Sequence, residues 1–389
     1  MKPRAITGLG VVSAVGVGTE PLFGALSEAA PLANAPPRPL ESFDAAAYPN
    51  AQNTVYEVPG FDPTKYLGDK GLRTLDRLTK LLVVAARLGM HDSGFKRDGV
   101  YVQSSPERVG ICCSNAYGSL EAITELDRVA QLEDARYINP AKFPNTVSNS
   151  ASGYASIWED LRALNVSVSD GNCGALDAVA CADIYLETRR ADALLVGGAE
   201  AMSEALYLAF RRLGAIGKGT RLGEGAALVM LEPMEHALAR KATIRAEVIG
   251  YGTAFHAPEG EELIFASAEA MESAIRTAIA DADVEASAVD LVVSGVSGIK
   301  PHDDAEIAAI SRVLGDAPIA APKSVLGETL GAGGAMGMAA ALACFAGAHP
   351  SPIVAGRAPR DVRDVRTVLV TSIGYYGNAS AVVMRAPRV

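Results

Sequence analysis

The chain contains two similar eleven-residue segments, one near its middle and one at its end. GEGAALVMLEP at 223–233 and GNASAVVMRAP at 377–387 share five of eleven residues and lie 154 residues apart. Each is apolar and valine-containing like a buried strand, and each follows a strand, a turn of small residues and a helical pattern, near 170–178 and 323–336. The repeat predicts an internal duplication with a boundary near 236–245.

Apolar runs of two kinds alternate along both halves. Short runs such as 166–169 and 193–196 are typical of buried β-strands, and the longer run at 175–190 between them is typical of a helix. This alternation indicates an α/β fold with largely buried strands. The length of 389 residues exceeds that of most single domains. We therefore expect two similar α/β halves, at 1–240 and 241–389.

Charge and hydropathy exclude two classes of protein. The chain carries 45 acidic and 35 basic side chains, a net charge of −10. Nucleic-acid binders are generally basic, so we expect no nucleic-acid partner. The uncharged run Leu330–Ala348 has the length of a membrane span, but its glycine and alanine content is only weakly hydrophobic. Such a run is typical of a buried, closely packed helix, and we expect no membrane insertion.

The five cysteines are odd in number, and none has the spacing of a metal-ligand motif. In a chain of this size we expect reduced thiols, a cytoplasmic location and no metal site. One of them, Cys173, lies between the short strand VSVS and a predicted helix. A thiol at a helix N-terminus can have a lowered pKa, and backbone N–H groups there can bind an oxyanion, so Cys173 is a candidate nucleophile. The alternative is a small buried cysteine that only fills the turn.

Seven segments spread over nearly the whole chain carry a resemblance to a known family: ITGLGVVSAVG, KGLRTLDRLTKLLVVAA, PAKFPNTVSNSASGYASI, ADALLVGGAEAM, LGEGAALVMLEP, KSVLGETLGAGG and GYYGNASAVVM. Together they resemble the β-ketoacyl synthases, the condensing enzymes of fatty-acid and polyketide synthesis. The resemblance implies the duplicated thiolase-like fold, in five layers ordered α-β-α-β-α. It also implies no cofactor, since the family's substrates are carried on the phosphopantetheine of an acyl carrier protein.

The residues expected at the catalytic site depart from the family's pattern of one cysteine, two histidines and a nearby lysine. The resemblance places the cysteine at Cys173 and retains the lysine as Lys323. The two histidine positions are occupied by Ser294 and Glu328. The resemblance also implies an oxyanion hole formed by the backbone N–H groups of Cys173 and Tyr375.

The loss of both histidines predicts that this chain does not condense acyl units. In the family the histidines donate hydrogen bonds to the enolate, and losing one such donor typically costs about 2.7–4 kcal/mol. Serine can donate one bond, whereas an ionised glutamate only accepts. Glu328 would also raise the pKa of a thiol at Cys173, although Lys323 can neutralise it in a buried ion pair. His302, eight residues after Ser294, is an alternative donor that the sequence leaves open.

Two functions follow from these departures. The first is a non-condensing subunit of the chain-length-factor type, which pairs with an active β-ketoacyl synthase and shapes its acyl tunnel during elongation on an acyl carrier protein. The second is a Cys173-dependent acyltransferase or thioesterase, which needs a nucleophile and an oxyanion hole but no enolate stabilisation. Loss of both histidines favours the first function. The persistence of Cys173 counts against it, because chain-length factors usually replace that cysteine too.

The resemblance also indicates which residues contact partners. A dimer, preferably with a ketosynthase subunit, is expected across the strand Asn165–Ser169. Candidates for closing the far end of the partner's acyl tunnel are Tyr117, Leu120 and Thr146. Docking of the acidic acyl carrier protein is assigned to Arg73, Arg77 and Lys80, although a solvated helix face explains these residues equally well.

Overall fold

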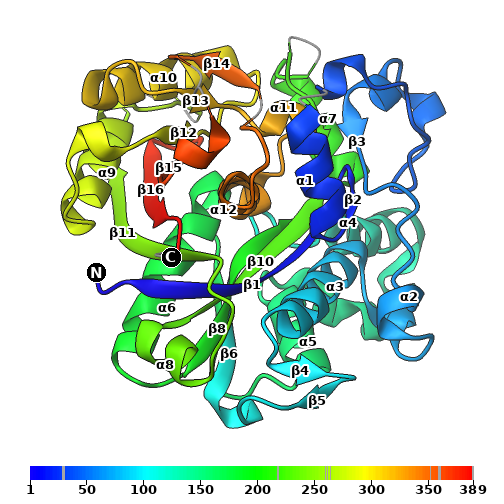
Figure 1. Ribbon diagram of the computed structural model, residues 1–389. Helices are drawn as coiled ribbons and strands as arrows, with labels where there is room; N and C mark the ends of the chain where they lie inside the picture. The colour runs from blue at the N-terminus through cyan, green and yellow to red at the C-terminus, as the bar shows by residue number, and fades with distance from the viewer. Residues whose placement is uncertain are drawn as a thin grey trace.

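The computed structural model describes residues 1–28, 31–216, 219–258, 260, 262, 264–350, 352–357 and 361–387. Among them, twelve strands join in one main sheet, which helices cover in Figure 1. Two small sheets lie apart from it: β3 (Val55–Tyr56) with β9 (Leu222–Gly223), and β4 (Lys96–Arg97) with β5 (Val100–Tyr101).

The main sheet consists of two sets of strands with the same order. The N-terminal set runs β7 (Asn165–Val168), β6 (Val109–Ser114), β8 (Ala193–Glu200), β10 (Gly225–Pro233) and β1 (Arg4–Ser13). The C-terminal set runs β13 (Ile319–Ala320), β12 (Leu291–Val293), β15 (Thr367–Ile373), β16 (Asn378–Arg385) and β11 (Ala246–Phe255). Two short strands extend the sheet: β2 (Gly16–Val17) beside β1, and β14 (Ile353–Ala355) beside β13.

Strand directions in the two sets also agree. In each set the first three strands are parallel and the last two pair antiparallel. The repeated segments form β10 and β16, which occupy equivalent places, and β1 pairs with β11 to join the sets. The predicted duplication is therefore confirmed, while the exact division at residue 240 stays a prediction.

Helices complete five layers. The N-terminal set packs on α3 (Arg77–Asp92) and α5 (Ser150–Glu159), and the C-terminal set packs on α9 (Ala268–Asp281) and α10 (Lys300–Leu314). Between the sets lie α6 (Gly174–Glu187) and α12 (Gly333–Phe345), each in contact with strands of both. Figure 1 shows α12 near the centre of the molecule. The α-β-α-β-α order of the thiolase-like fold is thus as expected.

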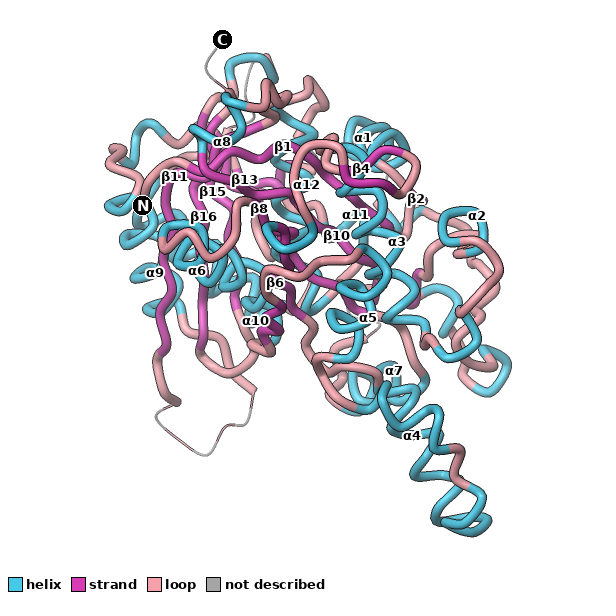
Figure 2. Tube along the Cα trace, turned by 90° about the horizontal axis from the view of Figure 1, so that it is seen from below, coloured by secondary structure: helices cyan, strands magenta, loops and turns pink. Residues whose placement is uncertain are grey.

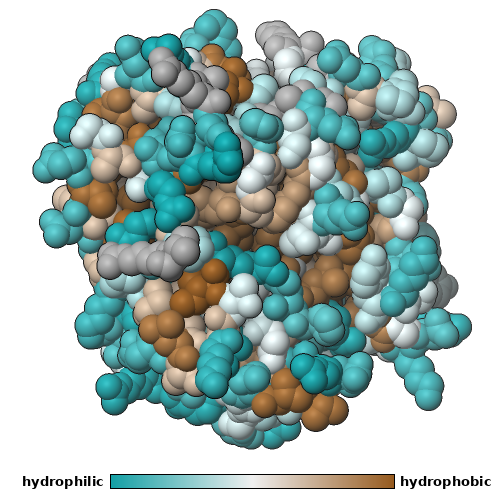
Figure 3. Space-filling model, viewed as in Figure 1, coloured by the Kyte–Doolittle hydropathy of each residue, from teal (hydrophilic) through white to brown (hydrophobic). Residues whose placement is uncertain are grey.

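The central helix α12 is the buried helix that the uncharged run predicted. Every residue from Gly333 to Cys344 is buried, and a side chain on Gly334 would come within 2.7 Å of Leu176 in α6, so only glycine permits this close approach. Figure 3 shows hydrophobic side chains in a hollow at the centre of this face, where Figure 1 places α12. Among the described residues, none of the helices combines the length and apolar composition that crossing a membrane needs.

The remaining helices have ten residues or fewer. They are α1 (Thr19–Glu28), α2 (Thr64–Leu67), α4 (Leu120–Val129), α7 (Glu204–Arg212), α8 (Met234–Ala239) and α11 (Lys323–Leu326). Figure 2 shows α4 and the turns after it projecting from the body of the protein. This projecting arm exposes large apolar side chains: Leu132 (77% exposed), Tyr137 (70%) and Phe143 (63%). Such exposure is typical of an interaction surface.

Candidate functional site

The elbow between β7 and α6 is a single 3₁₀ turn, Gly171–Cys173, whose glycine has a φ of 54°. In such a turn successive side chains point about 120° apart. The Nδ2 of Asn172 donates to the carbonyl oxygen of Ile373 at 3.5 Å, and the same side chain lies close enough to Tyr375, in the loop after β15, to oppose the rise in the pKa of its hydroxyl. The thiol of Cys173 instead donates to the carbonyl oxygen of Ser372, 3.3 Å away. The two side chains therefore bond adjacent carbonyl oxygens of β15, and of the two only Asn172 acts on the pKa of Tyr375.

Cys173 is not placed as an accessible nucleophile. Its side chain is 0% exposed, and burial, followed by the charges of Asp177 and Asp170, raises its pKa well above the usual value. Its backbone N–H donates to the carbonyl oxygen of Asp170 at 3.1 Å, which commits that donor. Burial, the raised pKa and the bonded N–H weigh against Cys173 as nucleophile and oxyanion donor, and both roles stay predictions. The elbow residue nearer to Tyr375 is Asn172, whose side chain acts on the pKa of the Tyr375 hydroxyl.

Glu328 and Lys323 form the buried ion pair that the sequence suggested. Lys323 begins α11, and Gly327, with a φ of 81°, reverses the chain so that the next residue, Glu328, returns toward it. The Nζ of Lys323 lies 2.9 Å from Oε2 of Glu328, with side chains 5% and 1% exposed. The Tyr375 hydroxyl donates to the same Oε2 at 3.3 Å, and the N–H of Leu330 donates to Oε1 at 2.8 Å. The acceptors of Glu328 are therefore engaged within the chain.

Ser294, at the end of β12, is buried and makes a structural contact. Its hydroxyl donates to the carbonyl oxygen of Ala320 in β13 at 2.8 Å. The adjacent N–H of Gly295 donates to Oε1 of the buried Glu306, also at 2.8 Å. The single proton of the serine hydroxyl is thus committed to the sheet, and Ser294 has no second donor for a bound substrate.

His302, on α10, lies beside the ion pair. Its ring makes an edge-on contact with the ring of Tyr375 at a centroid distance of 5.0 Å, and the residue is 6% exposed. Burial lowers the pKa of His302 to about 4. The charge of Glu328 opposes this shift, whereas the charge of Lys323 adds to it. Neither ring nitrogen has a hydrogen-bond partner among the described residues. His302 is therefore a neutral imidazole with an unused donor and an unused acceptor at pH 7.

A cavity of about 740 Å³ opens beside this cluster. Its walls are mainly aromatic and aliphatic, and Tyr375 and His302 form part of them. The other lining residues are Tyr117, Phe210, Leu213, Gly214, Ala215, Glu262, Ile264, Phe265, Ala266, Gly298, Ile299, Lys300, Pro301 and Tyr376. Cys173 is absent from this lining, so its thiol does not reach the cavity.

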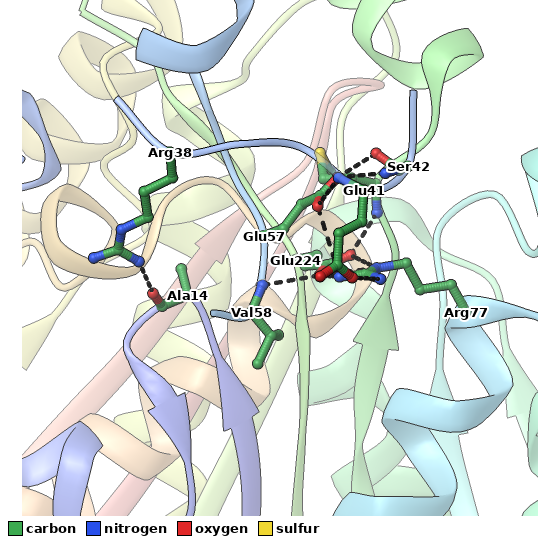
Figure 4. A network of polar contacts seen from close by, with 9 residues as sticks. Ala14, Arg38, Glu41, Ser42, Glu57, Val58, Arg77 and Glu224 are labelled. Atoms are coloured by element: carbon green, nitrogen blue, oxygen red, sulfur yellow. Dashed lines mark hydrogen bonds and ion pairs between the residues drawn. The ribbon is translucent and has the colours of Figure 1, made fainter. Parts of the chain in front are cut away.

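Arg77 is held inside the protein. Its guanidinium donates to the buried carboxylate of Glu224 at 2.6 Å and to Glu41 at 3.0 Å, as Figure 4 shows. Burial alone would lower the pKa of Arg77, but the hydrogen bonds and charges of Glu224, Glu57 and Glu41 raise it above its usual value. With its side chain 15% exposed, Arg77 stabilises the N-terminus of α3 against the sheet. This pairing weighs against a role of Arg77 in carrier-protein docking, which stays a prediction.

The other two docking candidates remain at the surface. Arg73 and Lys80 line a polar depression of about 260 Å³ together with Lys142. Acidic side chains, among them Glu121 and Glu125, line it as well, so its charge is mixed. A role for Arg73 and Lys80 in docking stays a prediction.

The three tunnel candidates occupy different surroundings. Tyr117 lines the cavity of its own chain together with Tyr376. Leu120 is partly buried at the start of α4. The hydroxyl of Thr146 donates to the carbonyl oxygen of Phe143 at 2.8 Å, at the base of the projecting arm. Their contact with a partner's tunnel stays a prediction.

Asn172 is the residue that sequence reasoning missed. The sequence does show that Asn172 and Cys173 are neighbours in a short turn. A shift of one residue therefore decides which of them lies toward Tyr375. The nucleophile was assigned to Cys173 because a thiol is reactive. Which side chain lies toward Tyr375 depends instead on the geometry of the turn. Within the described ranges, no three His, Cys, Asp or Glu side chains are grouped as a metal ion would require.

Comparison with known proteins agrees with this architecture. Residues 1–237 match the family description of the β-ketoacyl synthase N-terminal domain, and residues 245–353 match that of the C-terminal domain. The chain is 30% identical to 3-oxoacyl-[acyl-carrier-protein] synthase 2 of Coxiella burnetii, covering 85% of this chain and 83% of that one. It is 31% identical to nodulation protein E of Rhizobium leguminosarum bv. trifolii over 70% of each.

Among solved structures, the ishigamide ketosynthase/chain length factor superposes with a TM-score of 0.87 at 26% identity, covering all of both chains. A β-ketoacyl synthase from Burkholderia phymatum STM815 superposes with a TM-score of 0.85 at 24% identity, again over all of both chains. One conclusion follows from the two matched domains, from more than 30% identity to nodulation protein E over most of the chain, and from the duplicated five-layered fold. The chain belongs to the β-ketoacyl synthase family.

Proposed function

We propose that this chain is a non-condensing subunit of the chain-length-factor type, which pairs with an active β-ketoacyl synthase and shapes its acyl tunnel. The observation that carries the proposal is the side chain of Asn172. It faces Tyr375, and through it Glu328, from the elbow where the family has its nucleophile. A carboxamide does not attack a thioester, so no acyl-enzyme intermediate forms at this position.

The surroundings of Asn172 also disfavour decarboxylation. The hydroxyl of Ser294 is committed to a backbone carbonyl, and Glu328 offers only acceptors. An enolate forming beside Glu328 would add a second negative charge to a site whose one buried ammonium, on Lys323, is already paired. His302 supplies a single neutral donor, which cannot replace two. Each missing donor is expected to cost about 2.7–4 kcal/mol of transition-state stabilisation.

The proposed pairing surface is the edge of the sheet at β7. This strand is last in the strand order, and its outer edge has no partner strand within the described residues. Ile157 on α5 and Ile184 on α6, helices that pack on β7, are 75% and 61% exposed. An exposed strand edge between apolar side chains favours pairing with another chain. We propose a ketosynthase subunit and an acyl carrier protein as partners, and a cytoplasmic location.

The names of relatives are divided on this point. One solved relative is described as a ketosynthase/chain length factor, whereas the Coxiella burnetii relative is named as a synthase. The proposal therefore depends on the residues of this chain. The alternative, Cys173-dependent acyl transfer, lacks support because that thiol is buried, has a raised pKa and does not line the cavity.

The proposal is tested by assaying the chain alone and with β-ketoacyl synthases from its own genome. We expect the isolated chain to release no carbon dioxide from malonyl-carrier protein above the protein-free background. We expect a stoichiometric complex with one synthase by native mass spectrometry, and elongation only in that complex. Robust decarboxylation by the isolated chain, or failure to associate with any synthase, would contradict the proposal.

The variant Cys173→Ala, compared with the unaltered chain, tests the role of the elbow thiol. In the complex, Cys173→Ala should leave the rate and the length of the product unchanged if the thiol is only buried filler. Loss of activity in this variant, with the complex still formed, would instead support the Cys173-dependent alternative. Incubation of Cys173→Ala and of the unaltered chain with an acyl thioester, followed by mass measurement, shows without a partner whether Cys173 is acylated.

A further inference from the structure

The cavity beside His302 has the dimensions and walls of a small-molecule site. Its volume of about 740 Å³ lies within the range of about 300–1,000 Å³ that is usual for ligand pockets. Phe210 and His302 both contact the ring of Tyr375 edge-on, at centroid distances of 6.0 and 5.0 Å. Tyr117 and Tyr376 add further aromatic surface. Walls of this kind favour planar, conjugated ligands, which stack on aromatic rings.

His302 supplies the polar group that orients a ligand in such a cavity. It lines the cavity, is 6% exposed and has no hydrogen-bond partner on either ring nitrogen. A buried polar group without a partner is unfavourable, so a bound molecule that completes its hydrogen bonds gains affinity. The ring offers one N–H donor and one acceptor.

The charges near the cavity favour a neutral ligand. Lys323 is paired with Glu328 behind Tyr375, and Lys300, at the cavity wall, is paired with Asp304 at 2.6 Å. The carboxylate of Glu262 also belongs to the lining. A carboxylate or phosphate entering the cavity would lose its hydration without meeting an unpaired cation among the described lining residues.

We propose that this cavity binds, without covalent attachment, a small neutral planar molecule with a conjugated carbonyl group, whose oxygen accepts a hydrogen bond from the ring N–H of His302. The plane of the ligand packs against Tyr375 and Phe210. The inference goes beyond the partner-subunit function and does not depend on it, since the cavity, its walls and His302 belong to this chain alone.

Isothermal titration of the full-length chain with three probes tests the inference. Cinnamamide is neutral and carries a conjugated carbonyl, cinnamate carries a charge, and trans-β-methylstyrene lacks any hydrogen-bonding group. We expect cinnamamide to bind saturably and cinnamate to bind at least about 10-fold more weakly. His302→Phe keeps an aromatic ring and removes the hydrogen bond, so cinnamamide should lose about 5- to 10-fold in affinity while methylstyrene binding is unchanged.

Two further variants control for folding and location. His91→Phe changes an exposed histidine on α3 and should leave all three affinities unchanged. Ala215→Trp fills the cavity and should abolish binding of cinnamamide and methylstyrene, with an unaltered circular dichroism spectrum. No saturable binding of cinnamamide, equal weakening of both neutral probes by His302→Phe, or tightest binding of cinnamate would overturn the inference. These measurements use no synthase or carrier protein, so they fail independently of the partner-subunit function.

Discussion

The ammonium group of Lys323 lies 2.9 Å from the carboxylate of Glu328, and both side chains are almost fully buried. The Tyr375 hydroxyl donates to the same carboxylate at 3.3 Å. Two charges that neutralise each other leave no group free for an incoming substrate. The pair therefore acts as part of the core.

Breaking the ion pair should cost stability. Lys323→Met leaves the Glu328 carboxylate buried without its counter-charge, and we expect the free energy of unfolding to fall by about 3–5 kcal/mol. Urea denaturation followed by circular dichroism measures this. The double variant Lys323→Met/Glu328→Gln removes both charges and should recover most of the loss. A single variant as stable as the unaltered chain would contradict the contact.

Placing a thiol at the residue that faces Tyr375 should create reactivity. We expect Asn172→Cys to gain the mass of an acyl group after incubation with an acyl thioester, whereas the unaltered chain, which still has Cys173, does not. Because Glu328 opposes ionisation of a nearby thiol, Asn172→Cys/Glu328→His should acylate faster than Asn172→Cys alone. Intact-protein mass spectrometry gives both results. Acylation mapped to Cys173 in the unaltered chain would show that the elbow is placed differently.

Stability should depend on pH through Glu200. This carboxyl lies at the end of β8 and is fully buried, and burial raises its pKa from 4.5 to about 8. The backbone N–H groups of Ala116 and Gly331 oppose this shift, and the charge of Glu328 adds to it. Between pH 4.5 and 8 the folded chain holds a proton that the unfolded chain releases. The stabilising contribution of Glu200 to the free energy of unfolding is therefore fully present below pH 4.5 and is lost as the pH rises through 8.

The variant Glu200→Gln mimics the protonated carboxyl and should remove this dependence. We expect its free energy of unfolding to change less than that of the unaltered chain between pH 5 and pH 8, in urea titrations at each pH. If the free energies of unfolding of the two proteins change equally with pH, Glu200 is ionised in the folded state.

Pairing across β7 should depend on the apolar side chains that flank it. Ile184→Glu places a charge beside the strand edge, and we expect the complex with a synthase to weaken by at least about 10-fold, because a buried unpaired charge is costly. The matched control is Leu238→Glu on α8, since Leu238 is also 61% exposed but lies away from β7. Analytical ultracentrifugation compares the two. Equal effects of both variants would place the interface elsewhere.

Product length should respond to the projecting arm. We expect Leu120→Ala or Tyr117→Ala in the complex to lengthen the product, and Thr146→Trp to shorten it, because an overpacked tunnel end excludes a further two-carbon unit. Mass spectrometry of the released chains reads this. Tyr117 also lines its own chain's cavity, so an effect of Leu120 or Thr146 is the more direct test. Unchanged products in all three variants, with the complex intact, would leave these residues as interface filler.

The fold of this protein was predictable from local pattern. The repeat that became β10 and β16 placed the duplication, and the small, uncharged residues of α12 indicated a central buried helix. Hydrophobic periodicity and residue size act over a few neighbours, so they can be read directly from the chain. The same holds for Lys323 and Glu328, which pair because five residues and one glycine turn bring them together.

The site was decided by contacts between distant segments. Asn172 and Cys173 are neighbours, and which of them faces the site depends on the loop holding Tyr375, some two hundred residues later. Arg77 belongs to a helix pattern typical of an exposed face, yet it pairs with the buried Glu224, between β9 and β10. The sequence by itself determined the family and the duplicated halves. Only the tertiary structure decided which side chains meet, because direction and burial are set by packing between segments and not by residue type.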